Sequence, residues 1–427
     1  AQLVNMLYNI VDRIYIGHIP EVGSLALTGI GVCMPLILIV SAFSAFVASG
    51  GAPRASIFMG RGDCDSAERT LGGCLTMQVI ISLLLTAAML IWKDELLYLF
   101  GASENTIYYA ADYMGIYALG TIFVQITLGL NAFITAQGFA KVGMKTVIIG
   151  AVLNIVLDPL FIFTFDMGVK GAAVATVISQ AVCAVWVMGF LMSEKATLRL
   201  HWKNIRPDSR VMLAILGLGI SPFIMSSTES LVGFVLNSSL VRFGDLYVSA
   251  LAIMQSAMLF VSVPLVGFSQ GFVPVVGYNY GHGDNGRVKE CFRIVVKVMF
   301  FFNLSLVLFM ILFPELVAGV FTDDALLIAA VGEYMPLFLA GMTIFGLQRA
   351  CQNMFVALGQ AKVSVFIALL RKVILLIPLV LLLSRLVGLE GVFAAEAISD
   401  ALAAVLCTAI FAYQFPRILR RNVHATR

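Results

Sequence analysis

Long apolar runs separated by short polar segments make up most of the chain. Each run of about 20 residues is long enough to cross a roughly 30 Å hydrocarbon layer as a helix. The runs lack the strict alternation of polar and apolar residues that marks a strand, and lipid admits only helices or closed barrels. We therefore predict about twelve transmembrane helices, at 1–19, 29–59, 70–92, 113–136, 146–165, 171–192, 211–241, 247–277, 291–313, 334–357, 363–384 and 391–414.

The second half of the chain repeats the first half at an offset of 221 residues, which falls to 220 near the end. Many transporters are built from two such repeats around a central site. The sequence thus predicts an all-α polytopic membrane protein made of two pseudo-symmetric six-helix bundles. Matching pairs include Gly50 and Gly271, Pro53 and Pro274, Gly60 and Gly281, Asp63 and Asp284, and Ser179 and Ser399.

The repeat also predicts the domain boundaries. We expect an N-lobe at 1–192, a cytoplasmic linker at 193–210, a C-lobe at 211–414 and a cytoplasmic tail at 415–427. Aligning residues 3–9 with 231–237 leaves part of the seventh span without a counterpart. The alignment therefore predicts that the first helix is truncated at its start in this sequence.

Charge is scarce and unevenly placed. Only 12% of the 427 residues are charged and the mean hydropathy is +0.99, whereas about a quarter of a soluble domain is charged. One set of connecting segments carries 17 Lys and Arg and the other set carries four. Because basic loops stay inside, both termini should be cytoplasmic, in a multi-pass protein of the plasma membrane. The net charge of +3 is thus a topology signal, and no basic domain points to nucleic acid.

No motif predicts an enzyme. The seven Cys form no C-x-x-C pair and the four His are isolated, so neither a zinc site nor a catalytic constellation is indicated. The segment GFAKVGMKT (138–146) resembles a phosphate-binding loop, but it has one residue too many and no preceding strand. We expect no cofactor, and any pumping must then draw on a gradient of H⁺ or Na⁺.

Ionisable residues inside the second-half spans predict a cluster of ion pairs. A charge at a helix centre costs about 2.5–3.5 kcal/mol on insertion scales, so each needs a partner or a function. Glu396 and Asp400 are four residues apart and share one helix face, and a short turn joins their helix to the span with Arg371 and Lys372. We predict a structural or gating ion-pair cluster here, to which Arg349 adds a further cation.

The first half has a different set of polar side chains inside its spans, rich in oxygen and without an obvious cation. Asn154 and Asp158 are one turn apart, Asp12 lies on the first span, and Thr176 stands where the other half has Glu396. Such a set favours a cation, either as protons on the acids or as Na⁺ coordinated by the oxygens. The alternative is that Asp158 only satisfies backbone groups freed by the proline that follows it.

The equivalents of the two second-half cations are small apolar residues. Gly150 and Ala151 occupy the positions of Arg371 and Lys372. The duplication therefore predicts an asymmetry of chemistry between two similar lobes.

Four segments resemble multidrug and toxic compound extrusion (MATE) transporters of the prokaryotic type, and the resemblance covers nearly the whole chain. They are YNIVDRIYIG (8–17), NIVLDPLFIF (154–163), GVKGAAVATVIS (168–179) and YNYGHGDNGRVKEC (278–291). The resemblance implies a V-shaped pair of six-helix lobes that exports bulky, often cationic or amphipathic compounds in exchange for H⁺ or Na⁺. It implies an N-lobe cation site at Asp12, Asn154, Asp158 and Thr176, and Glu229 resembles an acid that some members use in the C-lobe.

We therefore expect a cation-coupled antiporter that exports organic drugs and toxins by alternating access, as a monomer in the lipid bilayer. Cation binding in the N-lobe would lower the affinity for drug, and drug would weaken cation binding equally. The alternative is a flippase for lipids or lipid-linked oligosaccharides. Flippases of that kind often show a cationic groove for anionic head groups. Here acids are available to Arg349, Arg371 and Lys372, which argues against such a groove. An intramembrane enzyme or a channel explains the sequence less well.

Overall fold

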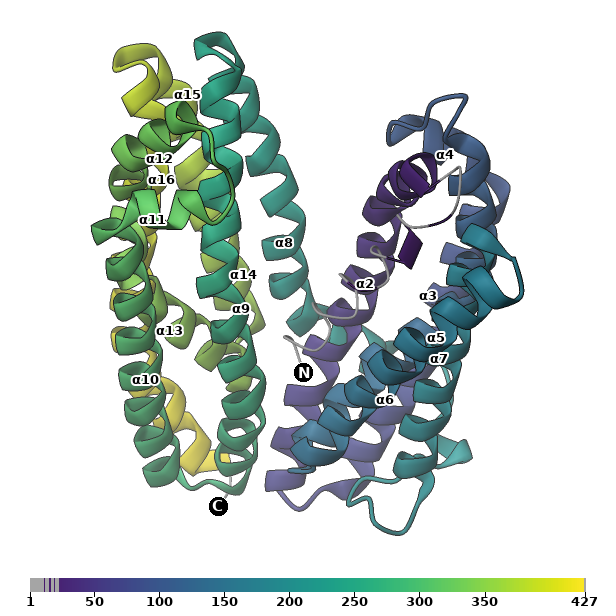
Figure 1. Cartoon of the computed structure of the whole chain (residues 1–427). Coiled ribbons are helices and arrows are strands. Elements are labelled where there is room, and N and C mark those ends of the chain that lie inside the picture. The colour runs from purple at the N-terminus through teal and green to yellow at the C-terminus, as the bar shows by residue number, and fades with distance from the viewer. Residues whose placement is uncertain (1–10, 12–14, 17–18, 20–22, 426–427) are drawn as a thin grey trace. The chain divides into compact units, whose positions relative to one another are not determined.

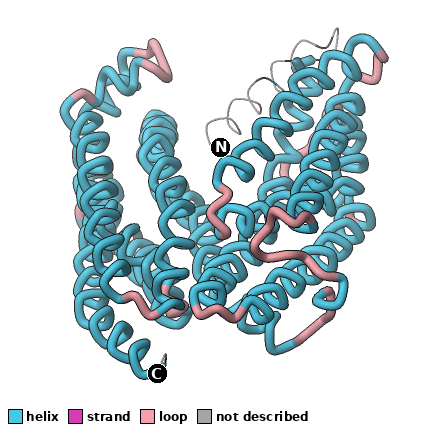
Figure 2. The backbone as a smooth tube through the Cα atoms, turned by 90° about the horizontal axis from the view of Figure 1, so that it is seen from below, coloured by secondary structure: helices cyan, strands magenta, loops and turns pink. Residues whose placement is uncertain are grey.

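The computed structural model describes residues 11, 15–16, 19 and 23–425. Helices make up nearly all of this part, which contains no strand (Figure 2). Ten helices in the described part are long and apolar enough to cross a membrane. The prediction of an all-α membrane protein is thus confirmed. The first span, predicted at 1–19, falls largely outside the described residues, and so does the prediction about its start.

The helices follow the predicted spans closely (Figure 1). Every predicted span from 29–59 onwards coincides with one helix or with a helix that changes type along its length. The first-half helices are α2 (Gly23–Gly60), α3 (Cys64–Ile91), α5 (Ile107–Ala136), α6 (Ala140–Pro159) with the π-helical turn η1 (Leu160–Thr164), and α7 (Gly168–Met192). The second-half helices are α8 (Ser209–Leu240), α9 (Asp245–His282), α10 (Asn285–Leu312), α12 (Ala325–Leu339) with η4 (Ala340–Ile344) and α13 (Phe345–Ala357), α14 (Ala361–Leu369) with η5 (Leu370–Leu376) and α15 (Ile377–Leu386), and α16 (Leu389–Ala425).

Two short helices were not predicted from the apolar runs. These are α4 (Lys93–Leu99) and α11 (Pro314–Gly319), and each follows a long helix directly. They are too short to span a membrane, so they leave no signal in a search for long apolar stretches. Pro314 stands at the start of α11, where its missing N–H leaves no helical bond unmade.

The chain divides into two compact units. The first comprises Ala1–Ser56 and Asp63–Gly219, and the second comprises Ile57–Gly62 and Ile220–Arg427. The segment predicted as a linker lies in the first unit. There the backbone N–H of Leu198 donates to Gln137 at 2.8 Å, and that of Arg199 donates to Glu68 at 3.2 Å. One boundary between the units falls within α8, and another falls near the end of α2, where Ile57–Gly62 belongs to the second unit.

A close approach of two consecutive helices recurs in both units and positions the polar residues described below. Gly171 on α7 lies against the backbone of Phe161, and a Cβ at this glycine would meet that carbonyl group. Its repeat equivalent Gly391 on α16 lies in the same way against the backbone of Leu383. Only a residue without a side chain fits so close an approach. The fifth and sixth spans, and likewise the eleventh and twelfth, therefore pack tightly.

Candidate functional site

Three of the predicted first-half residues meet inside the first unit. The side-chain amide of Asn154 donates to Asp158 Oδ1 at 3.1 Å and to Thr176 Oγ1 at 3.4 Å. Asn154 and Asp158 are one turn apart on α6, so they share a face, and α7 supplies Thr176. Asp158 is fully buried and Asn154 is 3% exposed. A buried carboxylate, an amide and a hydroxyl are thus gathered at one point.

The helix changes character directly after this point. Pro159 ends α6 and cannot donate a backbone hydrogen bond. The chain continues as η1, in which the N–H of Phe165 donates to the carbonyl of Leu160, five residues back. Single π-helical turns inside helices are rare overall, but those that occur are often found at functional sites.

A cavity of about 50 Å³ lies beside Asn154 and Thr176, within the first unit. A water molecule needs roughly 10–15 Å³ of such volume, so the space admits several waters or a cation with part of its hydration. Helices α5, α6 and α7 line it. The lining residues are Thr127, Leu128, Asn131, Thr146, Val147, Gly150, Ala151, Asn154, Thr176, Ser179, Gln180 and Cys183.

Most of the polar lining was not predicted. Asn131, Ser179 and Gln180 each bring a buried oxygen that has no hydrogen-bond partner in the described part of the chain, as does Asn154. Thr127 and Asn131 are one turn apart on an apolar span, which is the same signal that singled out Asn154 and Asp158. Applying that criterion to every span would have found the α5 side of the cavity.

Two predicted acids cannot be placed with the others. Asp12 lies outside the described residues. Glu229 falls on α8, but its side chain is not among those described. The structure therefore brings together Asn154, Asp158 and Thr176 only.

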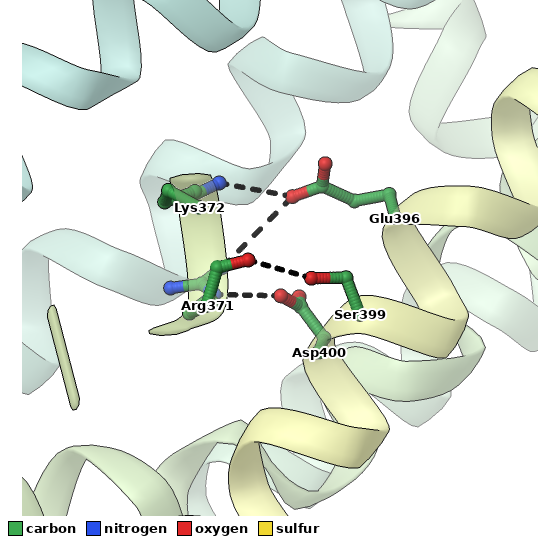
Figure 3. Close-up of polar contacts among 5 residues, drawn as sticks. All are labelled: Arg371, Lys372, Glu396, Ser399 and Asp400. Atoms are coloured by element: carbon green, nitrogen blue, oxygen red, sulfur yellow. Dashed lines mark hydrogen bonds and ion pairs between the residues drawn. The ribbon is translucent and has the colours of Figure 1, made fainter. Parts of the chain in front are cut away.

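The second unit brings together all four residues of the predicted ion-pair cluster (Figure 3). Arg371 Nε donates to Asp400 Oδ1 at 2.6 Å, and Lys372 Nζ donates to Glu396 Oε1 at 3.1 Å. A second guanidinium nitrogen of Arg371 lies 3.9 Å from the same oxygen of Glu396. The exposed fractions are 7% and 8% for the two cations and 2% and 1% for Glu396 and Asp400. The two acids project from one face of α16 toward η5.

Further contacts hold Arg371 in place. The hydroxyl of Ser399, between the two acids on α16, donates to the backbone carbonyl of Arg371 at 2.8 Å. The guanidinium also lies 4.3 Å from the centre of the Phe345 ring, a cation–π contact. Arg349 lies 5.8 Å from that ring. The cluster is thus anchored by backbone, ring and carboxylates together.

Comparison with known proteins agrees with a transporter of this architecture. The MatE family model matches residues 1–160 and 222–382. Multidrug export protein MepA of Staphylococcus aureus (strain N315) is 24% identical over 403 residues, covering 94% of this chain and 88% of the relative.

Solved structures are similar over nearly the whole chain. One is described as MATE in the bent conformation, with a TM-score of 0.90, 23% identity, and coverage of 99% of this chain and 94% of that one. Another is the MATE multidrug transporter DinF-BH, solved in complex with a ligand, with a TM-score of 0.86, 34% identity, and coverage of 97% and 93%.

Duplicated helical halves, each with a polar centre inside its bundle, define a multi-pass membrane transporter. The chain belongs to the MATE family. Its members are secondary transporters and not enzymes, and the chain is therefore a secondary transporter.

Proposed function

We propose that the chain exports organic, drug-like compounds in exchange for H⁺ or Na⁺ by alternating access. The relatives with known names are multidrug exporters or transporters, and one of them was solved with a ligand bound. In this proposal an N-lobe and a C-lobe, near the predicted boundaries, move relative to each other, and the linker joins them. Both termini would lie in the cytoplasm and the working unit would be a monomer.

The coupling cation binds in the first unit, at Asn154, Asp158 and Thr176 together with Asp12. The observation that carries this assignment is the buried hydrogen-bonded set of Asn154, Asp158 and Thr176, of which Asn154 and Thr176 line a cavity. A carboxylate can take up a proton, and carboxylate, amide and hydroxyl oxygens are the hard ligands that a small metal cation prefers. The same residues therefore serve either ion. Glu229 stays a further candidate acid in the C-lobe.

A flippase for anionic lipids is less well supported. Such a protein needs cations that face its substrate, whereas Arg371 and Lys372 are buried and paired with Asp400 and Glu396. Charges that are already paired inside the protein attract an anionic head group only weakly.

The test is coupled export by Asp158→Asn in reconstituted vesicles. Drug export is measured with a Na⁺ gradient alone and with a pH gradient alone, which also identifies the ion. We expect loss of export driven by whichever ion drives the wild type, because asparagine has no charge to exchange. Asp166→Asn is the matched control, since Asp166 is exposed, lies eight residues further along, and has a φ of 52° that asparagine tolerates. Export at the wild-type rate by Asp158→Asn would refute the assignment.

A further inference from the structure

The two units carry different residues at equivalent positions on equivalent helices. In the first unit Gly150 and Ala151 on α6 line the cavity. The repeat places Arg371 and Lys372 at these positions in the second unit, on η5. Two of the smallest side chains are thus exchanged for two long cations.

The facing helix shows the complementary exchange. Thr176 and Gln180 on α7 line the cavity with neutral oxygen groups. At an offset of 220 residues their equivalents on α16 are Glu396 and Asp400. These two carboxylates are the partners of the two cations. The second unit therefore holds a matched set of charges where the first unit holds neutral groups around an open space.

The surrounding packing changes in the same direction. A Cβ at Gly150 would lie 2.9 Å from Cys183 Sγ, so this sulfur restricts the side chain at that position in the first unit. The equivalent of Cys183 in the second unit is the buried Ala403, which is smaller. The absence of the thiol group leaves more room beside the helix, at the position where Arg371 stands.

The charges of the cluster cancel within the protein. Two cations face two carboxylates, and each of the four residues is at least nine-tenths buried. Buried charges inside a membrane are tolerated when they are paired, and leaving one of them alone is strongly unfavourable. As long as both cations stay in place, the two acids need no ion from solution.

The cations are also held more firmly than an exchangeable ion could be. Arg371 is fixed by Asp400, by the Phe345 ring and by the hydrogen bond from Ser399 to its backbone. Lys372 follows Arg371 directly in η5, so its ammonium group is tethered to the same helical turn. One oxygen of each acid, Glu396 Oε2 and Asp400 Oδ2, nevertheless has no hydrogen-bond partner in the described part of the chain. These oxygens remain as ligands for an added cation if a built-in one is removed.

We infer that Arg371 and Lys372 are built-in cations that fill, in the second unit, the place that the first unit keeps open for an exchangeable cation. Of these two equivalent places, only the one in the first unit then exchanges its cation with solution, and Glu396 and Asp400 form a latent cation site that the protein keeps permanently occupied. This inference rests on the proposed function for the location of the exchangeable cation. The claim that the second unit holds a masked site can be tested by itself.

The test measures the protonation of Glu396 by infrared spectroscopy of the whole protein in detergent, titrated with pH in NaCl or in choline chloride. In the wild type we expect Glu396 to stay ionised. The spectra of the wild type and of Glu396→Gln should therefore show the same protonated-carboxyl bands. In Lys372→Met, which keeps the length of the side chain but removes its charge, we expect the acid to acquire an exchangeable cation. If the cation is a proton, Lys372→Met shows a new protonated-carboxyl band that is lost in Lys372→Met/Glu396→Gln. If the cation is Na⁺, NaCl raises the melting temperature of Lys372→Met but not that of the double variant.

Two results would overturn the inference. One is a folded Lys372→Met protein whose Glu396 responds neither to pH nor to Na⁺. The other is a wild-type protein in which Glu396 already gives a titrating band. Should Lys372→Met fail to fold, the comparison of wild type with the charge-free pair Lys372→Met/Glu396→Gln decides, because any titrating band present only in the wild type contradicts a permanently occupied site. These results do not depend on Asp158→Asn, so failure of the proposed coupling site would be recognised separately.

Discussion

The interiors of the two units are built from equivalent helices, but they accommodate polar groups inside the membrane in different ways. Around Asn154 and Asp158 the first unit has hydrogen-bonded neutral groups, a carboxylate and an open cavity. At the positions equivalent to Gly150 and Ala151, which line that cavity, the second unit has Arg371 and Lys372 paired with two acids. Helices that are equivalent in the repeat thus carry side chains of different chemistry in the two units. A transporter built in this way can exchange a cation with solution in one half, while the charges in the other half stay paired within the protein.

The largest effect is expected where a locked charge loses its partner. Glu396→Gln leaves the ammonium of Lys372 buried without its carboxylate, and breaking a buried pair in this way costs about 3–5 kcal/mol. Unfolding in detergent measures the free energy. Glu390→Gln is the control, because Glu390 lies on the same helix and is exposed. Equal stability of the two variants would show that the pair contributes nothing.

A smaller effect is expected from filling the open site. Ala151→Leu places extra carbon atoms into the cavity of the first unit, and overpacking of this kind costs about 1–3 kcal/mol. The variant should also lose cation-driven export, since the space beside Asn154 is occupied. Val152→Leu, on the exposed side of the same helix, is the control. If Ala151→Leu exports at the wild-type rate, the cavity has no part in coupling.

Where the halves are alike, equal effects are expected. Asp63 Oδ1 accepts from the N–H of Ser66 at 3.0 Å, and its repeat equivalent Asp284 accepts from Arg287 at 3.0 Å. Each caps a helix start, so Asp63→Ala and Asp284→Ala should each cost about 0.5–2 kcal/mol. The asparagine variants should retain most of the stability. The measurement is the free energy of unfolding of each variant. Clearly unequal losses for Asp63→Ala and Asp284→Ala would show that the two caps, although alike in geometry, differ in their contribution to stability.

The smallest effect on stability is expected at Thr176. Thr176→Val removes the hydroxyl that accepts from Asn154 at 3.4 Å, and the loss of one ordinary hydrogen bond costs about 0.5–1.5 kcal/mol. The long distance favours the lower end of that range. The same variant should still lower cation affinity, measured as the ion concentration that gives half-maximal export. An unchanged concentration would remove Thr176 from the cation site.

The sequence predicted the fold well because lipid leaves few alternatives. Apolar length alone locates the helices, as the match between 285–312 and the predicted 291–313 illustrates. The short helices α4 and α11 were missed, since seven and six residues leave no apolar run of membrane length. The division of the eleventh span by η5 was also missed, because a π-helical turn depends on packing that no single sequence displays.

The sites were predictable where spacing decides. One turn separates Asn154 from Asp158 and Glu396 from Asp400, and the structure places each pair on one face. The role of Ser399 was not foreseen, because its hydroxyl binds a backbone carbonyl and no side chain. Nor does the sequence reveal the cavity, which depends on how three helices pack.

The most direct test compares two neutralised variants in the same vesicles. Coupled drug export is measured for Asp158→Asn and for Lys372→Met/Glu396→Gln, with each ion gradient applied alone. We predict that the first variant loses coupled export and that the second, in which two opposite charges are removed together, keeps it with an unchanged ratio of cation to drug. Coupled export that survives in Asp158→Asn and disappears in the folded double variant would contradict the account.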